Sequence, residues 1–133
     1  MKGALTTVPI IKELDIVGAR QSGRNLARDL GFGSVDQARI ATAISELARN
    51  IYLYAGSGEI SFQEVQGASP VGLKIVASDH GPGIENVSKV MEDGYSTSGG
   101  LGAGLPGVKR LMDEFDIISD DNGTKIIVVK WLR

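Results

Sequence analysis

The sequence predicts a two-layer α/β (α+β) fold that occupies residues 1–133 as a single domain. The 133 residues, 42% hydrophobic and 23% charged, have the composition of one ordinary globular domain. Apolar residues recur with helical spacing in the segments 16–30, 34–56 and 105–114. Strand-like segments, two pairs of them joined by turn-forming residues, lie at 6–11, 59–65, 73–78, 115–120 and 124–131.

The first two predicted elements are an edge strand and a helix. Residues 6–11 are apolar and β-branched, and Pro9 confines such a strand to the margin of a sheet. The helix at 16–30 has one buried face and stops at Gly31. Arginines 20, 24 and 28 lie four residues apart on another face of this helix. A solvated basic stripe is the favoured interpretation, and a docking or phosphate-contacting surface is the alternative.

The longest periodic segment is expected to be a helix from Ser34 to Gly56. Ser34 and Gln37 have the spacing of a capping box. At about 100° per residue, the side chains of Glu46 and Asn50 lie next to each other at the margin of the buried face. Arg49 is expected further toward solvent.

The middle of the chain is predicted to form a hairpin that ends in a polar turn. Strands at 59–65 and 73–78 are followed by the turn Asp79-His80-Gly81-Pro82-Gly83. Ligands of open α/β folds collect at the ends of strands, so the carboxylate of Asp79 is a candidate binding group. A short helix is expected at 86–93.

A glycine-rich run, Gly94 to Gly107, precedes the helix predicted at 105–114. Unpaired backbone N–H groups at the start of a helix attract anions, and Pro106 suits the first helical turn. The run therefore predicts a phosphate site, with a flexible linker or surface loop as the alternative. After the helix, Asn122-Gly123 predicts a hairpin between the last two strands.

Composition excludes several kinds of function. The chain has no cysteine and a single histidine, His80, which removes thiol chemistry and leaves little scope for a Ser-His-Asp triad. We expect His80 to be a turn residue and not a base. A net charge of −2 argues against a nonspecific nucleic-acid binder. No apolar run is long enough for a membrane span or a signal peptide, so we expect a cytoplasmic protein without nucleic-acid or membrane partners.

Four fragments occur in an order that resembles a known ATP-binding family. They are Glu46-Leu-Ala-Arg-Asn50, Asp79-His-Gly-Pro-Gly83, Gly100-Leu-Gly-Ala-Gly104 and Gly123-Thr124. The same order is found in DNA gyrase B, the heat-shock-ninety chaperones, the histidine kinases and MutL, which share the GHKL or Bergerat fold. The resemblance implies a mixed, mostly antiparallel sheet with helices on one face and ATP held between the two layers.

Longer stretches narrow the resemblance to one branch of this family. The segments ISELARNIYLYA and GLGAGLPGVKRLMDEF are similar to the serine/threonine kinases of anti-sigma and stress signalling, most of all to the switch kinases of the stressosome. The resemblance implies STAS-domain proteins as substrates and a serine phosphatase or another output protein as a later partner. A homodimer is left open. The alternatives are an anti-sigma factor that sequesters a sigma factor, and an ATPase that uses water as the acceptor.

The resemblance also implies roles for the residues around the phosphates. Glu46 would accept the proton of the substrate hydroxyl, and Asn50 would bind Mg²⁺ through its side-chain oxygen. Arg49 would contact the terminal phosphate in the transition state, although a plain surface arginine is an equal alternative.

The remaining implied roles concern the adenine and the loop over the phosphates. Asp79 would accept a hydrogen bond from the adenine amino group, and Thr124 would support that pocket. Gly81 and Gly83 would let the backbone approach the base. Lys109 and Arg110 are further candidates for phosphate contact. The loop that closes over the phosphates would consist of Gly100, Leu101, Gly102, Ala103, Gly104 and Leu105.

Overall fold

One antiparallel sheet forms the first layer of the fold. The computed structural model describes residues 5–67, 70–83, 91 and 104–132. Within this part of the chain, five strands lie in the order β1-β2-β3-β5-β4, and each neighbouring pair is antiparallel. The predicted, mostly antiparallel sheet is therefore confirmed, without a parallel pair among these strands. The strands are β1 (Leu5–Ile10), β2 (Gly58–Gln66), β3 (Val71–Asp79), β4 (Glu114–Asp120) and β5 (Gly123–Trp131).

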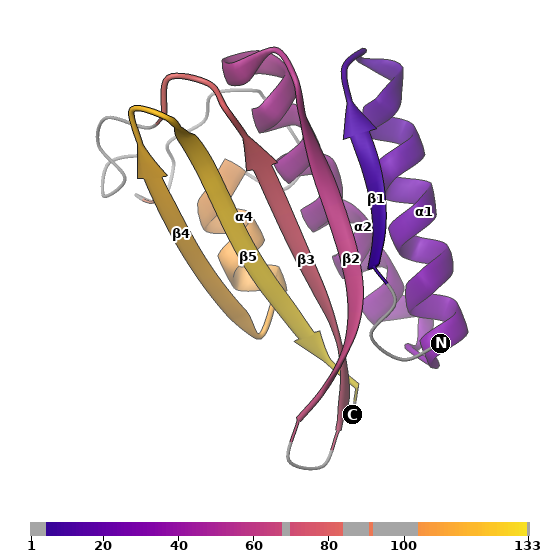
Figure 1. Ribbon diagram of the computed structural model, residues 1–133. Helices are drawn as coiled ribbons and strands as arrows, with labels where there is room; N and C mark the ends of the chain where they lie inside the picture. The colour runs from indigo at the N-terminus through magenta and orange to yellow at the C-terminus, as the bar shows by residue number, and fades with distance from the viewer. Residues whose placement is uncertain (1–4, 68–69, 84–90, 92–103, 133) are drawn as a thin grey trace.

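Helices α1 (Leu14–Leu30), α2 (Ser34–Asn50) and α4 (Gly104–Leu111) all cover the same face of the sheet (Figure 1). Side chains that point to this face are buried with the apolar sides of the helices. Because side chains alternate along a strand, the core residues of each strand lie two positions apart. The two-layer architecture is thus confirmed. Examples from the sheet side of the core are Ile10, Ile60, Phe62, Leu73, Ile75, Ile126 and Val128.

The start and the end of α1 are both fixed by local chemistry. At its start, the backbone N–H groups of Lys12 and Ile11 donate to Asp15 Oδ2 over 2.9 Å each, and they lower the pKa of this carboxyl group. At its end, Gly31 has a φ of 105°, in the left-handed region that favours glycine. The predicted stop at Gly31 is confirmed.

The start of α2 differs from the prediction. Gly33 is the N-cap and Ser34 is already helical, without a side-chain cap. The Gln37 side chain instead donates to the Phe32 carbonyl over 2.8 Å. The prediction of a capping box was therefore wrong, because the N-cap residue is Gly33, which has the extended backbone of an N-cap, and not Ser34. At the other end, the helix continues as a π-helical turn, η1 (Ile51–Ala55), up to Gly56.

The predicted end of the last helix was also wrong. Helix α4 ends at Leu111 and not at Glu114, which is the first residue of β4. The reason is a long-range contact, since the Asp113 N–H donates to the Val129 carbonyl of β5 over 3.0 Å. The edge position of β1 and both hairpins agree with the predictions. The short helix expected at 86–93 lies outside the described residues except for position 91.

Two glycines of α1 offer a matched test of how closely this helix packs. A Cβ at Gly23 would overlap Ile44 Cδ1 of α2 and lie 2.9 Å from Phe62 Cε1 of β2, whereas a Cβ at Gly18 would meet nothing within 4 Å. We expect Gly23→Ala to lower the free energy of unfolding by about 1–3 kcal/mol through overpacking. Gly18→Ala should raise it by about 0.5–1 kcal/mol through helix propensity. Urea unfolding measures both, and equal effects of the two changes would contradict the packing described.

Candidate functional site

Glu46 is the most deeply buried charged residue of the candidate site. It lies on the last turns of α2, and only 1% of its surface is exposed. Its Oε1 accepts from Arg49 Nη1 at 2.8 Å, and its Oε2 accepts from the backbone N–H of Gly104 at 3.2 Å. A carboxylate loses its hydration when it is buried, and these two hydrogen bonds compensate for that loss. The bond from Gly104 also joins α2 to the first residue of α4.

The position of Glu46 corrects one detail of the sequence analysis. Glu46 is not at the margin of the core but inside it, because α4 packs against the flank of α2 that carries it. Arg49 is about one third exposed, further toward solvent than Glu46 as expected, and it forms an ion pair with Glu46. Residues three apart on a helix are neighbours, which explains the pair.

Asn50 is the last residue of α2, one turn beyond Glu46, and it is half-buried. The described residues contain no cluster of three or more His, Asp or Glu side chains that could hold a metal ion. Magnesium does not require such a cluster, because phosphate oxygens and water complete its octahedron around a single protein oxygen. The chemistry of Asn50 therefore fits Mg²⁺ binding next to a polyphosphate.

Asp79 ends β3 and begins the predicted turn. Its Oδ1 accepts from the Gly81 N–H at 2.9 Å, which fixes the carboxylate within the turn. In the sheet, Asp79 lies between Gly58 of β2 and Thr124 of β5. Asp79 alternates with Ser78 along the strand, so it belongs to the side of the sheet that the helices cover.

The two turn glycines are required by close approaches of the backbone. A Cβ at Gly81 would lie 2.7 Å from Ala55 Cβ of η1. Gly83 has a φ of 80°, and a Cβ there would overlap the Asp120 carbonyl oxygen at the end of β4. Asn50 and this turn are thus brought to the same end of the fold through η1, which follows α2 directly and contacts β3.

Thr124 is buried beside Asp79, and its hydroxyl group contacts Ser119, a residue that the sequence analysis missed. Its Oγ1 is 2.8 Å from Ser119 Oγ of β4. Ser119 also lies 3.2 Å from the position of a Cβ on Gly83. Gly58 was missed as well, although a Cβ there would lie 3.1 Å from Asp79 Cβ. These contacts cross between strands, and no local pattern in the sequence could have indicated them.

The glycine-rich loop is described only at its end. Gly100, Leu101, Gly102 and Ala103 lie outside the described residues. Gly104 has a φ of 73° and begins α4, and Leu105 is buried behind it. Lys109 and Arg110 are exposed in the last turn of α4, so they lie away from the end that contacts Glu46. Their contact with phosphate stays a prediction.

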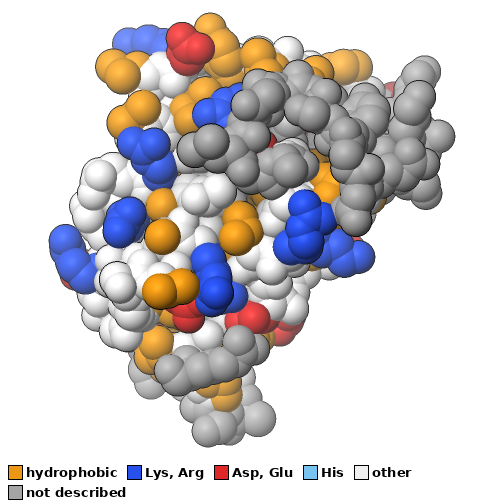
Figure 2. All heavy atoms as spheres, turned by 180° about the vertical axis from the view of Figure 1, so that it is seen from behind, with side chains coloured by type: hydrophobic (Ala, Val, Ile, Leu, Met, Phe, Trp, Pro, Cys, Tyr) orange, Lys and Arg blue, Asp and Glu red, His pale blue; other side chains and the backbone are white. Residues whose placement is uncertain are grey.

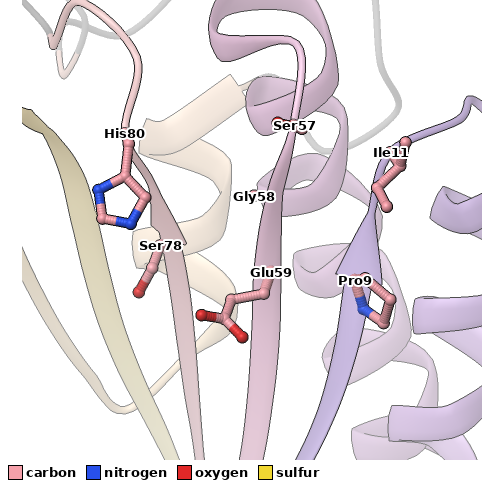
Figure 3. A pocket seen from close by; sticks show the side chains of 7 residues that line it. All are labelled: Pro9, Ile11, Ser57, Gly58, Glu59, Ser78 and His80. Atoms are coloured by element: carbon pink, nitrogen blue, oxygen red, sulfur yellow. The ribbon is translucent and has the colours of Figure 1, made fainter.

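A pocket of about 290 Å³ lies on the other face of the sheet, which no described helix covers (Figure 3). We call it the free-face pocket, and its lining residues are Pro9, Ile11, Ser57, Gly58, Glu59, Ser78 and His80. It is separate from Glu46 and Asn50, which belong to the helical layer. His80 is a turn residue here, as expected, and it points to the free-face pocket (Figure 3).

Comparison with known proteins identifies the family. The family described as "Histidine kinase-like ATPase domain" matches residues 12–130. The serine/threonine-protein kinase RsbT of Bacillus subtilis (strain 168) is 67% identical over 127 residues, which are 95% of this chain and 96% of RsbT. The chain belongs to the RsbT family of histidine kinase-like ATPase domains. The protein is therefore an ATP-dependent serine/threonine-protein kinase, as its sequence indicated.

Solved structures support the fold of the kinase. The RsbU and RsbW domains of Rv1364c from Mycobacterium tuberculosis match with a TM-score of 0.66 and 17% identity, over 98% of the kinase and 33% of that chain. The kinase thus spans about a third of that chain. The mycobacterial sensor histidine kinase MprB matches with a TM-score of 0.55 and 16% identity, over 97% of both chains. In the described part of the kinase, no helix is long and apolar enough to cross a membrane.

Proposed function

We propose that this kinase phosphorylates a serine or threonine of a STAS-domain protein in a stressosome-type signalling pathway and then engages a serine phosphatase or another output protein. The observation that carries this proposal is the high identity to RsbT over nearly the whole chain, together with a buried glutamate at the junction of α2 and α4. Phosphorylation adds a charge of about −1.5 to −2, which can break one protein interface and release the kinase for another.

In the proposed reaction, the substrate hydroxyl oxygen forms a bond to the γ-phosphorus of ATP while the bond to the β-phosphate oxygen breaks. ADP leaves, and Glu46 takes the proton of the hydroxyl group. Arg49 already lies 2.8 Å from this carboxylate. As a cation beside the base, it would also stabilise the negative charge of the transferring phosphoryl group.

The nucleotide is proposed to lie between the β3 turn and the start of α4. Asp79 would accept from the adenine amino group, with Thr124 beside it, and Gly81 and Gly83 would keep the turn free of side chains. The backbone N–H groups near Gly104 would face the phosphates at the N-terminus of α4. Mg²⁺, held by Asn50, would supply charge neutralisation for the phosphates.

The partner surface is proposed to include the exposed side of α1. Arg20, Arg24 and Arg28 are all exposed there. Figure 2 shows Lys and Arg side chains spread over the helical face of the molecule, with hydrophobic side chains between them. A mixed basic and apolar surface of this kind suits an acidic protein surface. We further propose that residues 1–133 act as one domain in the cytoplasm, without a nucleic-acid or membrane partner.

Phosphate transfer to a purified STAS-domain protein tests the proposed function. We expect incubation with γ-labelled ATP and Mg²⁺ to label the STAS protein on a serine or threonine, and EDTA to prevent the labelling. A STAS protein with that residue changed to alanine is the control. Labelled free phosphate without labelled protein would instead indicate an ATPase. Tight, stoichiometric capture of a sigma factor would indicate an anti-sigma factor.

A further inference from the structure

Lys130 is a buried cation for which the proposed reaction has no role. It lies on β5, points into the helical layer and is only 6% exposed. Its Nζ donates to the Leu111 carbonyl at the end of α4 over 2.9 Å. The same Nζ lies 3.6 Å from Asp113 Oδ1 and 3.8 Å from Asp36 Oδ1, the latter in the first turn of α2.

Polar contacts connect α4 to α2 at both ends of α4. The first residue of α4, Gly104, donates to Glu46 near the end of α2. The last residue, Leu111, is connected through Lys130 to Asp36 at the start of α2. The two helices therefore run antiparallel.

The junction after α4 is fixed to the same strand. Asp113 Oδ2 accepts from the Trp131 N–H at 2.7 Å, and the Asp113 N–H donates to the Val129 carbonyl. Lys130 thus lies between two backbone positions that already hold the end of α4. Its amino group donates to the Leu111 carbonyl, one of the carbonyls at the end of α4 that have no partner within the helix.

Stability alone does not explain a lysine at this position. Replacing a buried ion pair with apolar residues of similar size is often neutral or stabilising, so a methionine could fill the space. Buried charges are better suited to fixing one geometry among several, because they are satisfied only when their partners are in register. The geometry fixed here is the position of α4, and with it the contact of Gly104 with Glu46.

We infer that Lys130 is a positioning residue for the ATP site. It holds the C-terminal end of α4 against α2 and β5, so that the N-terminal end of α4 presents its N–H groups to the phosphates next to Glu46. Lys130 itself touches neither ATP nor the substrate. This inference rests on the proposed location of the phosphates at the start of α4.

The test compares ATP binding in variants of the full chain. We expect Lys130→Met to raise both the Kd for a non-hydrolysable ATP analogue and the KM for ATP by about tenfold, since small displacements of binding groups have large effects. Lys130→Arg keeps the charge and the donors and should recover most of the affinity. Where Lys130→Met alone folds poorly, Lys130→Met/Asp113→Asn also removes the negative charge of Asp113 and keeps an acceptor for the Trp131 N–H.

A stability control separates positioning from general destabilisation. Phe62 is buried on β2 beside Gly23 of α1, away from α4, and Phe62→Leu should lower stability without changing the Kd. The inference is overturned if Lys130→Met, or the double variant, binds the analogue like the wild type, or if Phe62→Leu weakens binding equally. Failure of the wild type itself to bind the analogue would instead contradict the proposed function.

Discussion

The Glu46→Gln variant is expected to lose phosphate transfer and to keep its affinity for ATP. Glutamine has nearly the volume of glutamate, and its one oxygen can still accept from the Gly104 N–H. It loses the ion pair with Arg49 and cannot take a proton from the substrate. The rate of transfer should fall by about 10²- to 10⁴-fold, the usual contribution of a general base. Single-turnover transfer to a STAS-domain protein measures the rate, and calorimetry with an ATP analogue measures binding.

The burial of Glu46 decides how this experiment is designed. Alanine at this position would leave a cavity and would also remove the acceptor for the Gly104 N–H, so a loss of activity could come from misfolding. Glu59→Gln is the matched control, because Glu59 is exposed in the free-face pocket. Wild-type rates for Glu46→Gln would remove Glu46 from the proposed mechanism.

The second large effect is expected at Asp79. Asparagine at this position keeps the oxygen that accepts from the Gly81 N–H, so the turn should survive. It lacks the charge and the second acceptor oxygen that the adenine amino group needs. A hydrogen bond to a charged group contributes about 1.5–3 kcal/mol, so the Kd for ATP should rise roughly tenfold to a hundredfold.

The control for Asp79→Asn is Asp116→Asn on β4, where the side chain is exposed. Circular dichroism and thermal unfolding should show that both variants fold. ATP affinity is expected to fall only in Asp79→Asn, and competition by GTP should become relatively stronger because adenine is no longer selected. An unchanged preference for ATP over GTP would argue that the adenine binds elsewhere.

Much of the fold was predictable because its elements carry local signals. The alternation in β2 and β3 gave the hairpin, and Pro9 gave the edge position of β1. Gly31 marked the end of α1 because only glycine readily adopts its φ of 105°. The stop signals at helix ends and the turn residues between strands thus determine where the chain reverses.

The errors occur where distant segments decide the local structure. Pairing of Asp113 with Val129 shortened α4, although the helical pattern of the sequence continues to Glu114. The burial of Glu46 depends on α4, which lies 58 residues further along the chain. An angular calculation on α2 alone cannot include that neighbour. It therefore placed the side chain correctly around the axis but too close to solvent.

The same limit applies to the supporting residues of the site. Glu46, Asn50 and Asp79 stand in recognisable fragments of sequence. Ser119 and Lys130 do not, because their partners come from other strands and helices. A lysine in the last strand resembles any surface lysine until the fold shows that it is buried.

A crystal structure of the kinase with a non-hydrolysable ATP analogue and Mg²⁺ tests the central claim most directly. We predict the adenine at Asp79 and Thr124, on the helical side of the sheet, and the phosphates at the start of α4 near Glu46 and Asn50. The metal ion should contact the Asn50 side-chain oxygen. An analogue bound in the free-face pocket, or phosphates distant from Glu46, would contradict the account.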